Sequence, residues 1–162
     1  MKGWIAGLLL ALAATGAWAG QPVTVAVLDV EYIDTSGEVR DQSQEHAARA
    51  ARLVEAMRDG LSASDGYRGV ALSCGDDPCT ARTTEPATLV KLARSAGAGL
   101  ILVPTVQKMS TLVQFAKVQA IAVATGDIVF DRWLTFRGDT DESWRRLQEY
   151  VLADFLKAAP HG

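Results

Sequence analysis

The residue best suited to acid–base chemistry is a single histidine in the body of the chain. His46 lies one turn into a stretch predicted to be helical, whereas the other histidine, His161, lies in the polar C-terminal tail. A Ser-His-Asp set would need such a histidine, but the Gly-x-Ser-x-Gly turn of many hydrolases is absent. A histidine near the start of a polar helix is more often a cap or a surface group. A catalytic and a structural role therefore both remain open for His46.

Three carboxylates follow the first predicted strand, which covers residues 23–30. Asp29, Glu31 and Asp34 lie at or beyond its carboxyl end, where open α/β sheets often bind ligands. They could hold a metal ion, or they could begin a solvated loop and accept hydrogen bonds from its backbone. Neither a Walker A motif nor Gly-x-Gly-x-x-Gly occurs. We predict no metal and no cofactor, and we treat Asp29 and Asp34 as ligand- or partner-binding candidates.

The second half of the chain has the densest polar chemistry, at predicted strand ends and at the start of the last predicted helix. Six candidate residues lie there: Lys108, Ser110, Arg132, Arg137, Asp139 and Asp141. Acidic side chains at a helix start repel anions, so a phosphate site is not expected. Asp139 and Glu142 have the spacing of a capping box. We predict an ion-pair network and a helix cap that serve structure or partner contact rather than catalysis.

The only two cysteines, Cys74 and Cys79, are separated by four residues that include a glycine and a proline. In an oxidising compartment such a pair indicates a disulfide that closes a short loop. Two alternatives remain open, a metal site supported by Asp76 and Asp77 and a redox-active pair. The spacing is not the Cys-x-x-Cys of redox motifs, so we predict a structural disulfide.

The first nineteen residues are typical of a secretory signal peptide. Lys2 supplies a positive charge, residues 5–14 are apolar, and Ala17-Trp18-Ala19 is a small-x-small cleavage motif. The apolar run is shorter than the roughly 20 residues that a permanent membrane helix needs. No second segment is long enough to span a membrane, and no cysteine follows the cleavage motif to carry a lipid. We predict export to the periplasm.

Composition excludes one class of partner. The chain of 162 residues has 19 acidic against 16 basic residues, and removal of residues 1–19 leaves 143 residues with a net charge of −4. No basic stripe is present, so a nucleic-acid partner is not expected. The mature length suits one domain with a sizeable core, and we predict a single α/β domain over residues 20–162.

The periodicity of apolar residues predicts the order β-α-β-α-β-β-β-α. Strands joined by helices should pair in parallel and strands joined by a hairpin antiparallel, so we expect one mixed sheet of about five strands with helices packed on it. In the last helix, Trp144 heads an apolar stripe and should be buried. Strands are predicted at residues 23–30, 69–73, 100–106, 112–123 and 128–136, and helices at residues 43–61, from 85 to about 96, and from 139 onwards.

Several of these segments resemble an uncharacterised secreted bacterial family, domain of unknown function 3280, with 2380 as a close relative. The segments that carry the resemblance are 29, 34–36, 106–112, 124–126 and 137–146. The family implies no activity, although some members accompany periplasmic quinoprotein alcohol dehydrogenases, which hints at an accessory role. The element order is also similar to the N-terminal domain of TolB and to the curli-secretion and penicillin-binding-protein activator lipoproteins. Those are interaction modules, and this second likeness is an analogy of fold.

Two functional hypotheses follow. The leading one is a non-enzymatic periplasmic binding or adaptor domain, which contacts an envelope protein partner through a sheet edge or a polar end. The alternative is a small ligand-binding or hydrolytic protein with its site near Asp29, Asp34, His46 and Lys108. A convergent pocket that joins these four residues would favour the alternative. An exposed strand edge or apolar patch without such a pocket would favour the adaptor.

Overall fold

The computed structural model describes residues 21–158. The predicted signal peptide at residues 1–19 and the tail with His161 lie outside the described residues. The strands are β1 Val23–Val27, β2 Glu31–Asp34, β3 Tyr67–Val70, β4 Leu100–Lys108, β5 Val113–Ala122 and β6 Ile128–Arg137. The helices are α1 Ser43–Ser62, α2 Pro86–Ser95 and α3 Asp141–Ala158. No helix among residues 21–158 is long and apolar enough to cross a membrane.

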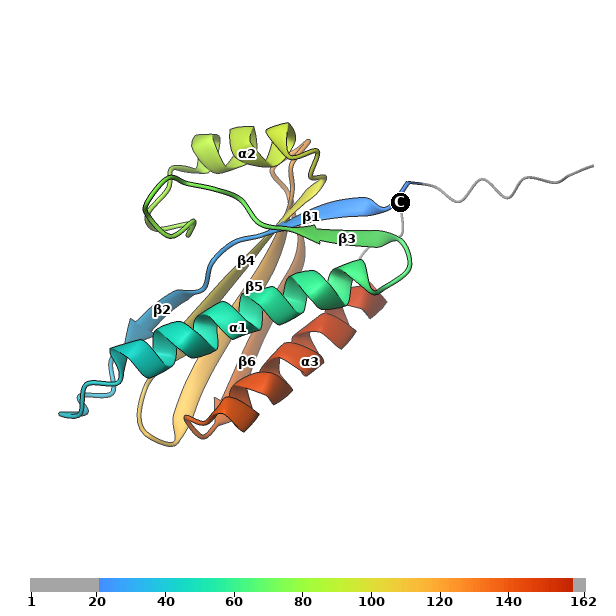
Figure 1. The fold of residues 1–162 in the computed structure, drawn as a ribbon. Helices are drawn as coiled ribbons and strands as arrows, with labels where there is room; N and C mark the ends of the chain where they lie inside the picture. The colour runs from blue at the N-terminus through green and yellow to red at the C-terminus, as the bar shows by residue number, and fades with distance from the viewer. Residues whose placement is uncertain (1–20, 159–162) are drawn as a thin grey trace, which may run out of the picture.

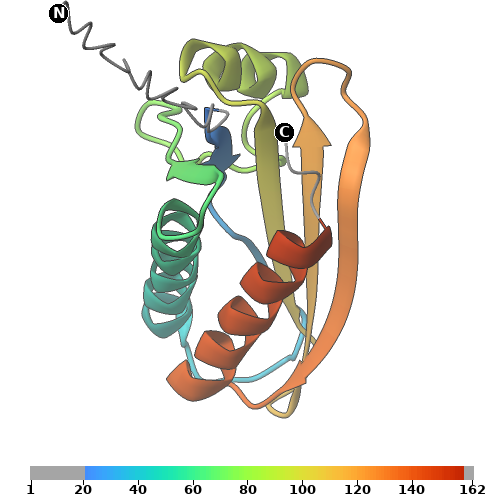
Figure 2. The same cartoon turned by 90° about the vertical axis from the view of Figure 1, so that its right-hand side faces the viewer.

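The six strands form one mixed sheet in the order β3-β1-β4-β5-β6, with β2 beside the second half of β4. The β1–β3, β1–β4 and β2–β4 pairs are parallel, and the β4–β5 and β5–β6 pairs are antiparallel. Helices α1 and α3 lie side by side on one face, and α2 lies at one end of the molecule (Figure 1). Turning the molecule shows β6 as the outermost strand of the sheet (Figure 2). The predicted single α/β domain with a mixed sheet is confirmed.

The sheet has one strand more than the five that we expected, because the strand predicted at residues 23–30 ends at Val27 and residues 31–34, which were expected to follow the strand, form a strand of their own. Val27 is opposite Leu102 and Glu31 is opposite Thr105, so β1 and β2 together have one more residue than the matching part of β4. Pro104 lies in β4 at this break. Backbone groups of alternate residues in a strand point to the same side. The Leu102 carbonyl accepts the Leu28 N–H, so the backbone nitrogen of Pro104, two residues on, also points toward β1 and β2. Proline has no N–H to donate there, so the ladder is interrupted.

The main core lies between the sheet and helices α1 and α3, on what we call the covered face. Helix α1 contributes a stripe of four apolar residues, Leu53, Val54, Met57 and Leu61. Helix α3 contributes Trp144, Leu147, Val151 and Phe155, as its periodicity predicts. Ring contacts of Phe155 with Tyr67 and Phe130, at centroid distances of 5.7 and 5.3 Å, join α3 to both edge strands. A second, smaller core lies under α2, where Leu89 and Ala93 pack near Ile101.

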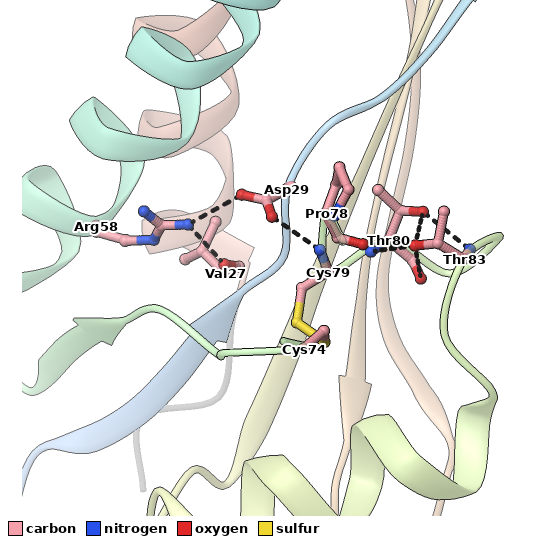
Figure 3. The surroundings of a disulfide bond; sticks show 8 residues. All are labelled: Val27, Asp29, Arg58, Cys74, Pro78, Cys79, Thr80 and Thr83. Carbon is pink, nitrogen blue, oxygen red and sulfur yellow. Dashed lines mark hydrogen bonds and ion pairs between the residues drawn. A yellow bond between two sulfur atoms is a disulfide. The ribbon is translucent and has the colours of Figure 1, made fainter. Parts of the chain in front are cut away.

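The predicted disulfide is present between Cys74 and Cys79. Its loop lies against the break between β1 and β2, where the Asp29 N–H donates to the Cys79 carbonyl at 3.0 Å. In return the Cys79 N–H donates to Asp29 Oδ2 at 2.9 Å (Figure 3). The interruption at Pro104 therefore leaves Asp29 free to bind the loop instead of β4. Arg58 in α1 adds a contact with the same carboxylate, 3.6 Å from its Oδ1.

Removing this disulfide should have a modest effect on stability. We expect the double variant Cys74→Ala/Cys79→Ala to lose about 2 kcal/mol, because a loop this short restricts the unfolded chain little. Urea denaturation of the mature protein measures the loss. Reductant should bring the wild-type protein to the same midpoint as the variant. A loss above about 5 kcal/mol would mean that the loop has a larger structural role than its length implies.

Candidate functional site

Lys108, at the end of β4, is completely buried beneath the helices. Strand alternation puts it on the covered face together with Val106. Its Nζ donates to Glu38 Oε2 at 2.6 Å, to Asp139 Oδ2 at 2.9 Å and to the side-chain oxygen of Gln42. A buried ammonium group needs such partners, since an unpaired charge away from water is very costly.

Asp139 receives donors from three directions. His46 Nε2 lies 2.7 Å from its Oδ2, which Lys108 also contacts, and Arg49 Nη1 donates to its Oδ1 at 2.9 Å. Gln114 holds the preceding carbonyl, because its Nε2 donates to Gly138 O at 2.9 Å. Asp139 is thus the centre of a buried charged cluster, which we define as Glu38, Gln42, His46, Arg49, Lys108 and Asp139.

The prediction that Asp139 and Glu142 form a capping box is wrong. Helix α3 begins at Asp141, and the capping pair is Thr140 with Ser143. The Ser143 N–H donates to Thr140 Oγ1 at 3.2 Å, and the Thr140 N–H donates to Ser143 Oγ at 3.1 Å. Asp139 lies one residue before this cap and turns into the charged cluster instead. The Glu142 side chain pairs with Arg145 at 2.8 Å on the surface.

Two pKa shifts show that the central ion pair keeps its charges. Burial alone would raise the pKa of Asp139, but hydrogen bonds from His46 and Lys108 outweigh it and hold the pKa below its ordinary value. Burial would lower the pKa of Lys108, but hydrogen bonds to Glu38 and Asp139 raise the pKa above its ordinary value. A general acid or base works best with a pKa near the working pH. Asp139 and Lys108 are shifted away from that range, which suits a structural ion pair.

His46 is stacked against the ring of Tyr32 and is nearly fully buried, so the interpretation of His46 as a surface group is wrong. The ring of Tyr32 in β2 stacks on it with centroids 4.5 Å apart and an interplanar angle of 27°. Tyr32 is in turn 6.0 Å from the ring of Trp144. Burial, followed by the nearby carboxylates of Asp34 and Asp139, raises the pKa of Tyr32 far above its ordinary value. The phenol therefore stays protonated, and the stack fixes the imidazole against Asp139.

A cleft of about 920 Å³ lies beside this cluster. It is bounded by β2, the first half of α1 and the loop at residues 76–83, and three of the four residues of the ligand-binding hypothesis line it: Asp29, Asp34 and His46. Lys108 does not line it, because Glu38 and Gln42 lie between. The lining has two arginines, Arg40 and Arg82, against seven carboxylates, which are Asp29, Glu31, Asp34, Glu38, Asp41, Asp76 and Asp77.

The two carboxylates predicted as ligand-binding candidates both accept hydrogen bonds from backbone N–H groups of nearby loops. Asp29 anchors the disulfide loop, as described above. Asp34 Oδ1 accepts the Ser36 N–H at 2.9 Å and the Ser36 hydroxyl at 2.6 Å. No group of three or more His, Cys, Asp or Glu residues within residues 21–158 is arranged to hold a metal ion.

Of the remaining candidates, Ser110, Arg132 and Arg137 lie away from the buried cluster, and Asp141 contacts it from outside. Ser110 Oγ accepts the Val113 N–H at 3.1 Å in the β4–β5 turn, and Arg132 pairs with Asp154 of α3. Asp141 is largely exposed and touches the cluster from outside, 2.8 Å from Arg49 Nε. Arg137 lies exposed at the end of β6.

A second surface was missed by the sequence analysis. Among residues 21–158, no helix covers the part of the sheet that lies opposite the covered face along β5 and β6 (Figure 2). The side chains of this surface come from alternate positions of the two strands. We call it the open face and define it as Phe115, Lys117, Gln119, Asp131, Trp133 and Thr135. The signal that could have found it is the period-two alternation of both strands, which predicts one face with these residues and one apolar face.

Two aromatic side chains are exposed on the open face. Trp133 is 68% exposed and Phe115 is 36% exposed. Lys117 is directly across from Trp133, with its Nζ 5.0 Å from the ring centroid. Gln119 Nε2 donates to Asp131 Oδ2 at 3.2 Å beside them. The result is a polar rim around an exposed indole ring.

Solved structures with the same fold come from bacterial proteins. TolB from Acinetobacter baumannii is 13% identical with a TM-score of 0.53, covering 86% of this chain but only 29% of the TolB chain. The hypothetical protein CT253 from Chlamydia trachomatis is 11% identical with a TM-score of 0.54, covering 84% of this chain and 97% of that one. At these identities the likeness shows the fold alone. It confirms the predicted similarity to the TolB fold.

A weaker likeness is to the C-terminal domain of LpoB from Salmonella enterica. It is 18% identical with a TM-score of 0.44, covering 75% of this chain and 86% of that domain. No curated protein sequence matches the chain. A family model described as "Protein of unknown function (DUF2380)" matches residues 23–156. Because the match spans most of the chain, as the resemblance implied, the protein belongs to this family, DUF3280.

Proposed function

We propose that this domain is a non-enzymatic binding module of the bacterial envelope that contacts a protein partner through its open face. The observation that supports it most is the exposure of Trp133 and Phe115 on a part of the sheet that no helix within residues 21–158 covers. Large aromatic side chains provide much of the contact energy in protein interfaces. The location in the envelope rests on the predicted signal peptide at residues 1–19.

The arrangement of the charged residues supports the same proposal. Of the side chains best suited to acid–base chemistry, His46 and Lys108 both bind Asp139. A catalytic site places a poised acid, base or nucleophile around a space that a substrate can enter. Only His46 of these three lines the cleft, and its Nε2 is already held by Asp139. The aromatic side chains, by contrast, are directed at solvent.

A capture experiment tests the proposed role. The tagged mature protein is incubated with native periplasmic extract, and bound proteins are identified by mass spectrometry. We expect Phe115→Ser/Trp133→Ser to retain at least tenfold less of a specific partner, because truncated aromatic anchors typically cost at least about 2 kcal/mol. Tyr150→Ser, which removes an exposed aromatic side chain from α3, is the matched control and should capture normally. Equal capture by both variants would contradict the open face as the contact surface.

The acidic cleft favours a second candidate, the binding of a small ligand. Its carboxylates outnumber its arginines, and its inner wall includes the apolar residues Ala47, Ala50 and Val54. Concave sites with an apolar wall and a few polar groups are the usual form of small-molecule sites. The charge balance suits a cationic ligand such as a polyamine.

Titration calorimetry with spermidine separates the two candidates. Binding that weakens with salt and is lost in Asp76→Asn/Asp77→Asn would support the ligand site, with Asp65→Asn/Asp127→Asn as the control away from the cleft. A hydrolase screen should accompany it. Activity that His46→Ala or Asp34→Ala abolishes in a folded protein would overturn the non-enzymatic proposal.

A further inference from the structure

The outer edge of β6 is the longest strand edge without a partner in the sheet of residues 21–158, since the other strands with a free side, β2 and β3, have four residues each. Within residues 21–158 no strand lies beyond β6, and it runs for ten residues without proline or glycine. Natural proteins usually protect such an edge with a proline, a bulge, a covering segment or charged side chains. The bulge of this hairpin lies near Ala120 and Ile121, away from residues 131–137. Within the described part of the chain, the protecting device found along residues 131–137 is charged side chains, at positions 131, 132 and 137.

The unpaired backbone groups belong to alternate residues. The Gly138 N–H donates to Leu112 O of the β4–β5 turn, so even-numbered residues of β6 face β5. The N–H and C=O groups of the odd-numbered residues therefore point away from the sheet. Those residues are Asp131, Trp133, Thr135 and Arg137.

We propose that β6 pairs antiparallel with β6 of a second copy of this chain, with Leu134 on the two-fold axis. In this register Asp131 is opposite Arg137 of the second copy, and Trp133 is opposite Thr135. Two-fold symmetry repeats each pair, as in any isologous dimer. Both exposed charges of the edge are thereby paired with opposite charges. This inference goes beyond the proposed function, because it concerns a second copy and not the envelope partner.

Charge complementarity selects this register among the symmetric alternatives. An axis at Arg132 puts two arginines directly opposite each other, which destabilises a strand pair. An axis at Trp133 leaves Asp131 opposite Thr135 and puts Arg137 opposite Val129. An axis at Thr135 leaves Asp131 beyond the paired residues. Only the axis at Leu134 pairs both charges.

The same register also matches the covered face. Leu134 is half-buried at the edge, and in the dimer it would contact its own copy across the axis. Arg132 would lie opposite Phe136 of the second copy, and its guanidinium already lies 5.0 Å from the ring centroid of Phe130 within the chain. On the other side the two open faces would join into one continuous surface with two copies of Trp133.

Cysteine cross-linking tests the register directly. Residues on the axis belong to a non-hydrogen-bonded pair with Cα atoms about 4.5 Å apart, which is within the range of a disulfide. Leu134→Cys should therefore form a covalent dimer under mild oxidation. Phe136→Cys is the matched control, because its own copy lies four residues along the strand, about 13 Å away. The native cysteines do not interfere, since Cys74 and Cys79 are bonded to each other.

Charge reversal provides a second readout without cysteines. By sedimentation velocity, Asp131→Arg and Arg137→Asp should each weaken the dimer by about tenfold or more, because like charges meet twice in the symmetric pair. The double variant Asp131→Arg/Arg137→Asp should restore the wild-type affinity. Asp127→Arg changes the net charge by the same amount as Asp131→Arg, but it lies in the β5–β6 turn. It should therefore have no effect on the affinity of the dimer.

Three results would overturn the dimer. The first is wild-type protein that remains monomeric at about 100 µM. The second is Leu134→Cys cross-linking no faster than Phe136→Cys, and the third is a double charge reversal that fails to restore association. A monomer that still captures an envelope protein through Trp133 would refute the dimer and leave the proposed function standing. A dimer that captures no envelope protein would leave the β6 pairing standing and contradict the proposed function.

Discussion

Asp139→Asn should destabilise the domain by about 3–5 kcal/mol, the usual cost of removing one partner from a buried ion pair. The substitution preserves the shape of the side chain but leaves Lys108 and Arg49 without their shared carboxylate. Urea denaturation of the mature protein measures the change as a lower midpoint with an unchanged slope.

Asp141→Asn is the matched control, because it removes the same charge two residues further on. Asp141 pairs with Arg49 and Arg52, but its side chain is 69% exposed, so the loss should stay below about 1 kcal/mol. A loss of stability in Asp139→Asn as small as that in Asp141→Asn would show that the charged cluster contributes little to stability.

The cluster also predicts a dependence on pH. The pKa of Asp139 is lowered in the folded protein by hydrogen bonds from His46 and Lys108, which outweigh the effect of burial. Its contribution is therefore complete above the ordinary aspartate pKa and is lost as the pH falls through the lower folded value. The stability difference between wild type and Asp139→Asn should narrow below about pH 4. A difference that stays constant down to pH 2 would contradict the shift.

Trp144→Ala should cost about 3–5 kcal/mol, as large truncations in a packed core do. Trp144 is 3% exposed and packs edge-on against Phe136, with ring centroids 6.1 Å apart. It also contacts Tyr32, so its loss would loosen the ring that holds His46. Thermal and urea unfolding both measure the effect.

Trp133→Ala provides the comparison for the same substitution at an exposed site. Its effect should lie within about 0.5 kcal/mol, as for most surface substitutions. Once the signal peptide is removed these are the only two tryptophans, so the Trp133→Ala protein should emit only the fluorescence of a buried indole. A large loss of stability on removal of Trp133 would make it part of the core and weaken the proposed contact surface.

Most of the fold could be predicted because its signals are local. The helix from Ser43, the proline at the start of α2 and the β5–β6 hairpin follow from periodicity and turn residues within single segments. Strand β2 could not be found in this way. Its four residues are polar at both ends, and they form a strand because Lys108 and its neighbours in β4 offer backbone partners about 70 residues away.

The charged cluster was only half predictable, for a similar reason. The types of Lys108 and Asp139 indicated an ion-pair network, but the spacing of Asp139 and Glu142 favoured a cap. Ser143 forms the cap with Thr140 instead. Asp139 therefore binds His46, which lies 93 residues earlier in the chain. Burial of His46 depends on Tyr32, whose strand was itself missed.

The two functional hypotheses concern two separate surfaces of the molecule. Asp29, Asp34 and His46 do meet at one cleft, but Lys108 is sealed below it, so the four residues of the ligand-binding hypothesis do not form one site. The adaptor hypothesis expected an exposed strand edge or an apolar patch, and the structure has an exposed edge at β6 and two exposed aromatic side chains, Trp133 and Phe115, beside it. The period-two alternation of β5 and β6 separates two faces of the sheet, but which face the helices cover depends on how α1 and α3 pack together, which no single segment shows.

Photo-crosslinking in living cells tests the central claim, that the open face binds an envelope protein. Benzoylphenylalanine replaces Phe115 on the open face or, as the control, Tyr150 on α3; both native side chains are exposed and aromatic. We expect a discrete adduct with a second envelope protein at position 115, absent at position 150 and lost when Trp133 is also changed to serine. No adduct at position 115, or the same adducts at both positions, would contradict it.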